Sequence, residues 1–183
     1  MKRVKEVIFI FGLLVAPFLA SATTIIPLSV EEMTTKSTHV LRGNATETWT
    51  AWNPQHTLIY TYTKFEVTKS LKGQVQQTVT VKQMGGRVGN TVQKVAGVRH
   101  FRPGEQDVLF LQPSKDHDGT FIVTGLMQGN FLVRRSASGQ MLVSNGVPEV
   151  SKVEAQSGVI SGYRGTTSTV DELENRIRKA VQQ

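Results

Sequence analysis

Histidines and carboxylates are the first candidates for chemistry in this sequence, because imidazole and carboxylate groups transfer protons and bind metal ions. None of the four histidines lies four residues from another, and no His-Glu-x-x-His motif occurs, so no helical zinc site is predicted. An enzyme, such as a hydrolase acting on envelope polymers, would need a site that only the fold assembles. Its candidate residues are His39, His56, His100 and Glu105.

Other catalytic and ligand-binding motifs are missing or incomplete. The chain has no cysteine, no Gly-x-Ser-x-Gly nucleophile motif and no Ser-x-x-Lys. Segment 116–119 lacks the spacing of a calcium loop and predicts a hairpin turn. The glycine-rich segment 85–90 lacks the Gly-Lys-Ser/Thr of a phosphate loop and predicts a wide turn, with an anion nest around Arg87 as the alternative. No catalytic residue, metal or cofactor is therefore predicted.

Four aromatic residues are the strongest candidates for a binding surface. Trp49 and Trp52 are expected at the tip between two strands, where loops usually carry polar residues, and Tyr60 and Tyr62 follow closely. Such aromatics favour recognition of a protein, a glycan or single-stranded nucleic acid. The alternative is that one tryptophan closes the end of a barrel by burial. We expect Trp52 to be the more exposed tryptophan and Trp49 to be at least half buried.

Strands joined by turns must position these residues. After residue 38 the chain is rich in Thr, Val, Tyr, Phe and Gln, with glycines and prolines between short runs. No long helical pattern separates these runs, so a parallel βαβ sheet is not expected. Segment 136–139 predicts a hairpin turn between the last two strands. The predicted strands are His39–Thr50, Leu58–Leu71, Gln77–Gln83, Asp107–Gln112, Thr120–Thr124, Asn130–Arg135 and Gln140–Ser144.

Two of these strands carry further information. Segment 58–71 has 14 residues, which would span about 46 Å if straight. Its tyrosines lie on even positions whereas Phe65 and Val67 lie on odd ones, so a single buried face would need a bulge near Thr63. Such a long, bulged strand is typical of the corners of small barrels. The continuous apolar run 108–111 predicts a strand that is buried on both faces.

Two helices are predicted, one on each side of the strand region. Ser29 and Glu32 have the spacing of a capping box at the start of a helix over Val30–Lys36. Thr169 and Glu172 repeat this pattern near the C-terminus. An apolar stripe at helical spacing follows: Val170, Leu173, Ile177 and Val181. We expect this amphipathic helix to pack on the strands, with a partner-binding helix as the alternative.

The first 22 residues have the three parts of a secretory signal peptide: a basic start, an apolar run and an Ala-Ser-Ala site. Cleavage after Ala22 would leave 161 residues and reduce the net charge from +7 to +5. No later apolar run has the length of a membrane span. We therefore expect an exported protein, periplasmic or extracellular, without stable membrane insertion. The lack of cysteine is ordinary for a bacterial envelope protein.

The predicted fold class is mainly β: an OB-like closed or partly open antiparallel barrel with a short N-terminal helix and a C-terminal amphipathic helix. Residues 1–22 are predicted to be the signal peptide. Residues 23–156 are expected to form the β-barrel domain with its short helix. Residues 157–183 are expected to form a flexible loop rich in Gly, Ser and Thr, followed by the C-terminal helix.

Four motifs follow one another between Leu28 and Val133: Phe65–Gly73, Thr78–Gly86, Phe101–Leu111 and Gly125–Phe131. Their order resembles a family of uncharacterised exported bacterial proteins, and the core is similar to the OB barrel of netrin modules and tissue inhibitors of metalloproteinases. The resemblance implies a five-stranded barrel with terminal helical additions and no catalytic centre. Inhibitors of that type chelate zinc through an N-terminal cysteine. This chain has no cysteine, so their mechanism is not carried over.

The sequence favours a non-catalytic, exported β-barrel module that binds a protein or a glycan, with an exported protease among the candidate partners. Its candidate binding residues are Trp49, Trp52, Tyr60, Tyr62 and Arg87. The envelope-polymer hydrolase is the alternative. Binding of single-stranded nucleic acid is a second alternative, against which the export signal and the small positive charge argue.

Overall fold

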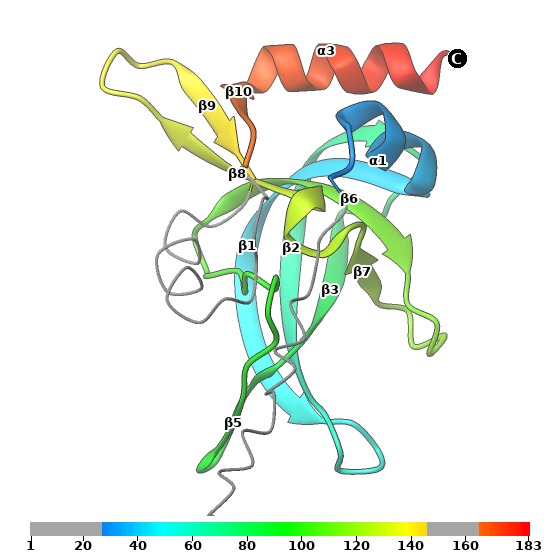
Figure 1. Ribbon diagram of the computed structural model, residues 1–183, viewed down its shortest axis with the longest axis vertical. Helices are drawn as coiled ribbons and strands as arrows, with labels where there is room; N and C mark the ends of the chain where they lie inside the picture. The colour runs from blue at the N-terminus through cyan, green and yellow to red at the C-terminus, as the bar shows by residue number, and fades with distance from the viewer. Residues whose placement is uncertain (1–26, 146–164) are drawn as a thin grey trace, which may run out of the picture.

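The computed structural model describes residues 27–145 and 165–183, which form a mainly β structure with two α-helices (Figure 1). The predicted signal peptide and residues 157–164 of the predicted loop lie outside these residues. In chain order the elements are α1 (Val30–Lys36), β1 (His39–Trp52), β2 (Ile59–Lys72), β3 (Thr78–Met84), β4 (Gly86–Val88), β5 (Thr91–Gln93), β6 (Gln106–Pro113), β7 (Phe121–Val123), the 3₁₀ helix η1 (Leu126–Gly129), β8 (Asn130–Arg135), β9 (Met141–Ser144), β10 (Thr167–Thr169) and α3 (Val170–Val181).

The seven predicted strands are confirmed as β1, β2, β3, β6, β7, β8 and β9, with ends that differ by at most two residues. The predicted turns 116–119 and 136–139 are confirmed as well, and Gly119 and Gly139 have the positive φ that such turns favour. The segment 85–90 differs from its prediction: a tight turn at Gly89 joins β4 and β5 into a hairpin. Three-residue strands give too little alternation to be detected in the sequence.

Backbone pairing joins five strands into a closed ring (Figure 1). β1 pairs with β2 and β6, β2 pairs with β3, and β7 lies between β3 and β6. All of these pairings are antiparallel except β3–β7, which is parallel. β8, β9 and β10 extend the same sheet beyond β6, whereas β4 and β5 form a separate two-stranded sheet.

β6 is buried on both faces, as its apolar run predicts. Val108 and Phe110 point into the cluster beneath the helices, and Leu109 and Leu111 point into the cluster shared with β1, β2 and β3. All four side chains have an exposure of 0 %. β6 therefore separates the two halves of the hydrophobic core.

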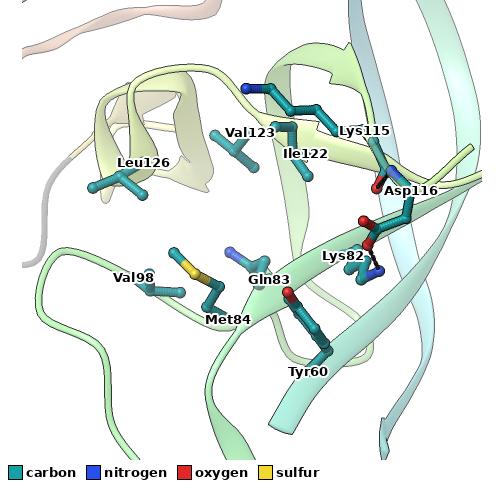
Figure 2. Close-up of a pocket in the computed structure, with 11 residues that line it drawn as sticks. Tyr60, Lys82, Gln83, Met84, Val98, Lys115, Asp116, Ile122, Val123 and Leu126 are labelled. Atoms are coloured by element: carbon teal, nitrogen blue, oxygen red, sulfur yellow. Dashed lines mark hydrogen bonds and ion pairs between the residues drawn. The ribbon is translucent and has the colours of Figure 1, made fainter. Parts of the chain in front are cut away.

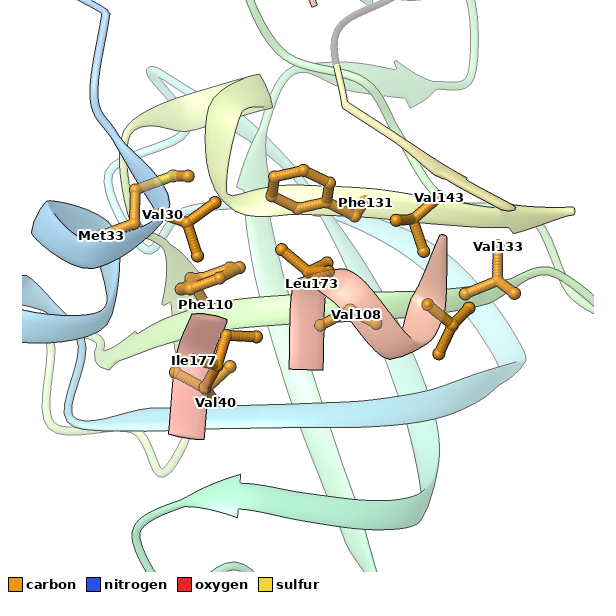
Figure 3. Packing of buried hydrophobic residues seen from close by; sticks show 11 residues of the cluster. Val30, Met33, Val40, Val108, Phe110, Phe131, Val133, Val143, Leu173 and Ile177 are labelled. Atoms are coloured by element: carbon orange, nitrogen blue, oxygen red, sulfur yellow. The ribbon is translucent and has the colours of Figure 1, made fainter. Parts of the chain in front are cut away.

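The two helices lie side by side over one of these clusters (Figure 3). Both begin with the predicted capping box. Val30 and Met33 of α1 and Leu173 and Ile177 of α3 are buried against strand residues such as Phe110. The predicted packing of the C-terminal helix on the strands is confirmed, except that Val181, the last residue of the stripe, is 44 % exposed.

Ion pairs at the edge of this interface connect α3 to the rest of the fold. Arg176 donates to both carboxylate oxygens of Glu31 in α1, at 2.8 and 2.7 Å. The carboxylate of Glu174, almost completely buried, accepts from Lys69 of β2 at 2.5 Å and lies 3.4 Å from Arg42 of β1. These contacts fix the rotation of the helix about its axis, which apolar packing alone defines less sharply.

The expected bulge in β2 is present, but not at Thr63. The register between β2 and β3 runs without a shift through Thr63. In the pairing with β1, the extra residues of β2 are Thr68 and Leu71, and a third irregularity leaves Thr46 of β1 unpaired opposite Phe65 and Lys64. Thr61 and Thr63 are buried, and their hydroxyl groups bond to Gly85 O and to the Thr48 hydroxyl. The buried face of β2 therefore keeps one phase, and its tyrosines point to the other face.

Candidate functional site

The outer face of β1, β2 and β3 gathers aromatic and cationic side chains into two adjacent rows. Trp49 pairs with Tyr62, and Tyr62 pairs with Lys82 across the next strand. Beside this row, Tyr60 pairs with Met84. Because paired residues of neighbouring strands point to the same face, the side chains of Trp49, Tyr60 and Tyr62 form one surface, which we call the aromatic face.

The rings of the aromatic face touch one another. Trp49 stacks on Tyr62 with a centroid separation of 5.4 Å and an interplanar angle of 10°, and Tyr60 lies 6.4 Å from Tyr62. Trp49 is 40 % exposed, which confirms that it is at least half buried. The expected order of the tryptophans is wrong, because Trp52 is less exposed than Trp49. β1 extends to Trp52, whose ring stacks on His56 of the following turn.

A pocket of about 300 Å³ opens next to the aromatic face, between β3 and β7 (Figure 2). Tyr60 and Met84 form one wall, Ile122 and Val123 of β7 form the other, and Leu126 of η1 lies at one end. Met84 and Leu126 are 39 % and 40 % exposed. We call this cavity the β3–β7 pocket, and its walls are predominantly apolar.

Lys82 lies at the opposite end of the β3–β7 pocket (Figure 2). Its ammonium group donates to Asp116 at 2.5 Å and to Asp118 at 3.0 Å, and it stands 4.4 Å above the centroid of the Tyr60 ring. The Lys82 side chain is only 7 % exposed. This cation therefore attaches the β6–β7 turn to β3 and sets the width of the pocket.

The protonation states at this end of the pocket follow from the same contacts. Burial alone would lower the pKa of Lys82, but the hydrogen bonds to Asp116 and Asp118 outweigh it and raise the pKa above its ordinary value. Burial would raise the pKa of Asp118, yet hydrogen bonds from Thr120 and Lys82 lower it to about 2. Lys82 therefore stays charged, which does not suit it to act as a nucleophile or a base.

We expect Lys82→Met to lower the free energy of unfolding by about 1 kcal/mol at pH 7. The value is small because Asp116 and Asp118, which lose their cation, are partly exposed to water. A depressed carboxyl pKa contributes stability above the unfolded value of 3.8 and loses it as the pH falls towards about 2. Urea unfolding of both proteins should show their difference shrinking between pH 4 and pH 2. A difference that stays constant over this range would exclude the ion pair as its origin.

The structure separates the other candidate residues from the aromatic face. Trp52 pairs with Ile59 on the opposite face of the hairpin, and Arg87 lines a different cavity beside β4 and β5. His39 is the first residue of β1, whereas His56 follows its last, so the 14-residue strand lies between them. Glu105 pairs with Arg99 at 2.8 Å. The four candidate residues of the hydrolase hypothesis are therefore not assembled into one cleft.

Within residues 27–145 and 165–183, no three His, Cys, Asp or Glu side chains are grouped so that they could hold a metal ion. Neither of the helices found there has the length and apolar character needed to cross a lipid bilayer.

Sequence reasoning missed Lys82, Met84 and Leu126 as parts of the site. The useful signal was the Asp-x-Asp of the turn 116–118, whose two carboxylates attract a cation, but nothing in the sequence identifies Lys82 as that cation. No protein-family model and no curated protein matches this chain.

Proposed function

We propose that this protein is a non-catalytic, exported binding module that captures a protein partner through the aromatic face and the β3–β7 pocket. The observation that carries the proposal is an apolar pocket lined by exposed Met84 and Leu126, next to an aromatic face that carries the exposed Trp49. Protein interfaces are enriched in Trp, Tyr and Met, and their binding energy concentrates where one anchor side chain fills a pocket. The export part of the proposal rests on the signal-peptide pattern in residues 1–22.

An OB-like barrel is the fold that we propose for the five-stranded ring. The ring order β1-β2-β3-β7-β6, closed by the β1–β6 pairing, supports this assignment, as does the resemblance of residues 28–133 to OB-barrel proteins. OB folds bind ligands on the face of their second and third strands, between two loops. Here the corresponding face carries Tyr60, Tyr62 and Met84, and the corresponding loops are 53–58 and 114–120.

The walls of the pocket favour a protein partner over a glycan. Met84, Ile122 and Val123 offer no hydrogen-bonding side chains and Lys82 already donates to two carboxylates, although Gln83, Ser114 and Lys115 also line the pocket. Burying sugar hydroxyl groups against the apolar walls would leave them without partners, at a cost of about 1–3 kcal/mol for each group. An aliphatic or aromatic side chain of a partner protein gains free energy in the same place.

The test is a matched pair of double variants of the mature protein. Met84→Gln with Leu126→Gln makes the pocket polar, whereas Met141→Gln with Leu58→Gln makes the same chemical changes at similarly exposed positions elsewhere, 36 % and 41 %. We expect capture of a partner from envelope extract, followed by titration of the purified partner, to weaken at least about tenfold, or ~1.4 kcal/mol, in the pocket variant only.

Three results would contradict the proposal. Equal affinity of the two double variants for the captured protein would place its binding elsewhere. Saturable binding of a purified glycan that the pocket variant loses would change the class of partner. Saturable turnover of an envelope polymer by the mature protein would replace the binding module with an enzyme.

A further inference from the structure

A second cavity, of about 730 Å³, lies beside the β4–β5 hairpin, and none of the three residues of the aromatic face lines it. Its floor is the face of the β1–β2 hairpin opposite to the aromatic face. On this floor, Thr48, Thr50 and Thr61 point towards β4. The β4–β5 hairpin and the chain that follows it form the other walls, at the lower end of the molecule in Figure 1. We call this cavity the β4–β5 pocket.

Hydrogen bonds and close packing fix the β4–β5 hairpin on this floor. The Thr50 hydroxyl donates to Arg87 O at 2.5 Å. The Gln93 side chain accepts from Ile59 N at 2.6 Å and donates to Thr57 O at 3.1 Å. A Cβ atom at Gly86 would lie only 2.7 Å from the Thr61 hydroxyl oxygen, and Gly86 has a φ of 141°, so only glycine suits this close approach. The walls of the pocket are therefore preformed.

The charge in the β4–β5 pocket has a single sign. Arg87, Lys94 and His100 line it, and none of the described residues in its lining is acidic. Within the described part of the chain, the side chains of Arg87 and Lys94 form no ion pair. The His100 ring is oriented by its Nε2, which must donate because its partner, 3.0 Å away, is the carbonyl oxygen of Met84.

An apolar surface accompanies these cations. Val92, Val95 and Val98 also line the β4–β5 pocket, and Val92 is 45 % exposed. The pocket therefore offers two unpaired cations to an anionic group and apolar contacts to the organic body that carries it. Its volume lies in the range of small-molecule sites, roughly 300–1,000 Å³.

We propose that the β4–β5 pocket binds an organic phosphate, with the phosphate held by Arg87 and Lys94 and the organic body packed on the valines. A phosphate monoester carries between one and two negative charges at neutral pH, which two cations can balance. The guanidinium group presents its donors in a fork that matches phosphate oxygens. This site lies on the other face of the β1–β2 hairpin from the protein-binding site proposed above, and the two pockets share one lining residue, Val98.

The experiment compares three forms of the mature protein: wild type, Arg87→Gln with Lys94→Gln, and Arg134→Gln with Arg135→Gln. Both double variants remove two positive charges from exposed positions, and the second pair, on β8, lies outside the pocket. One arm titrates glycerol 3-phosphate, with glycerol as the neutral reference, and follows the amide signals of residues 86–98 by NMR. The other arm measures cosedimentation with vesicles of phosphatidylglycerol and of phosphatidylcholine.

We expect the wild type and the Arg134/Arg135 variant to bind alike, and the Arg87/Lys94 variant to bind at least about tenfold more weakly, with all thermal midpoints unchanged. Binding of glycerol 3-phosphate would identify a soluble ester as the ligand. Binding of phosphatidylglycerol vesicles alone would identify a lipid headgroup. No binding in either arm, or equal weakening in both double variants, would overturn the proposal. Met84→Gln with Leu126→Gln should leave this binding intact, which separates it from the protein-binding site.

Discussion

Arg99→Met is expected to lower the free energy of unfolding by about 3–5 kcal/mol at pH 8, the usual cost of removing one partner from a buried ion pair. Arg99 donates to Asp107, whose exposure is 0 %, and also to Glu105 at 2.8 Å. The second carboxylate oxygen of Asp107 has no hydrogen-bond partner among the described residues. Without Arg99, Asp107 would have to stay ionised with no compensating cation in the core or take up a proton, and either outcome costs stability at pH 8.

The size of this effect should depend on pH. Burial raises the pKa of Asp107 to about 7 although Arg99 opposes the shift. A raised carboxyl pKa means that the folded state binds the proton more tightly than the unfolded state, so Asp107 lowers stability as the pH rises from about 4 to 7. Removing Arg99 raises this pKa further and extends the decline to higher pH. The loss of stability should therefore be larger at pH 8 than at pH 5.

Urea unfolding of wild type, Arg99→Met and Arg102→Met across pH 5 to 8 tests this expectation. Arg102→Met makes the same chemical change three residues away at an exposed side chain, and its stability should match that of the wild type within about 0.5 kcal/mol. A loss in Arg99→Met that is the same at pH 5 and pH 8 would show that Asp107 does not titrate in this range. The Gln83 side chain donates to Arg99 O at 2.7 Å, so Gln83 holds the backbone next to Val98, which lines both pockets.

Leu173→Ala is expected to cost about 2–5 kcal/mol, the range for large-to-small changes in a packed core. Leu173 is 1 % exposed and lies in the cluster that α3 shares with α1 and the strands (Figure 3). We expect a single unfolding transition with a lower midpoint, because α3 is part of the same folding unit as the sheet.

Val181→Ala is the matched control on the same helix. Val181 belongs to the same apolar stripe but is 44 % exposed, so its truncation should change the free energy of unfolding by less than about 0.5 kcal/mol. Equal and small effects of the two substitutions would contradict the packing of α3. They would favour a helix that is available to a partner, which is the alternative that the stripe itself leaves open.

The sequence by itself determined the local structure of this protein. Both capping boxes place the helix starts at Val30 and Val170, because the Ser or Thr hydroxyl and the Glu carboxylate act within four consecutive residues. The run 108–111 is buried on both faces, as continuous apolar residues in a strand predict. These signals depend on neighbours in the chain, so they can be read without the fold.

The tertiary structure alone decided which residues meet at the sites. Lys82 and its partner Asp116 are 34 residues apart, and the register of β1, β2 and β3 places Trp49, Tyr62 and Lys82 in one row. The same register corrected two expectations, because it keeps Thr61 and Thr63 buried and leaves Trp49 more exposed than Trp52. Strand pairing depends on hydrogen bonds and packing between distant segments, and a shift of one residue reverses every side chain of a strand. Residue types and spacing identified candidate aromatics, and pairing between strands assigned them to faces.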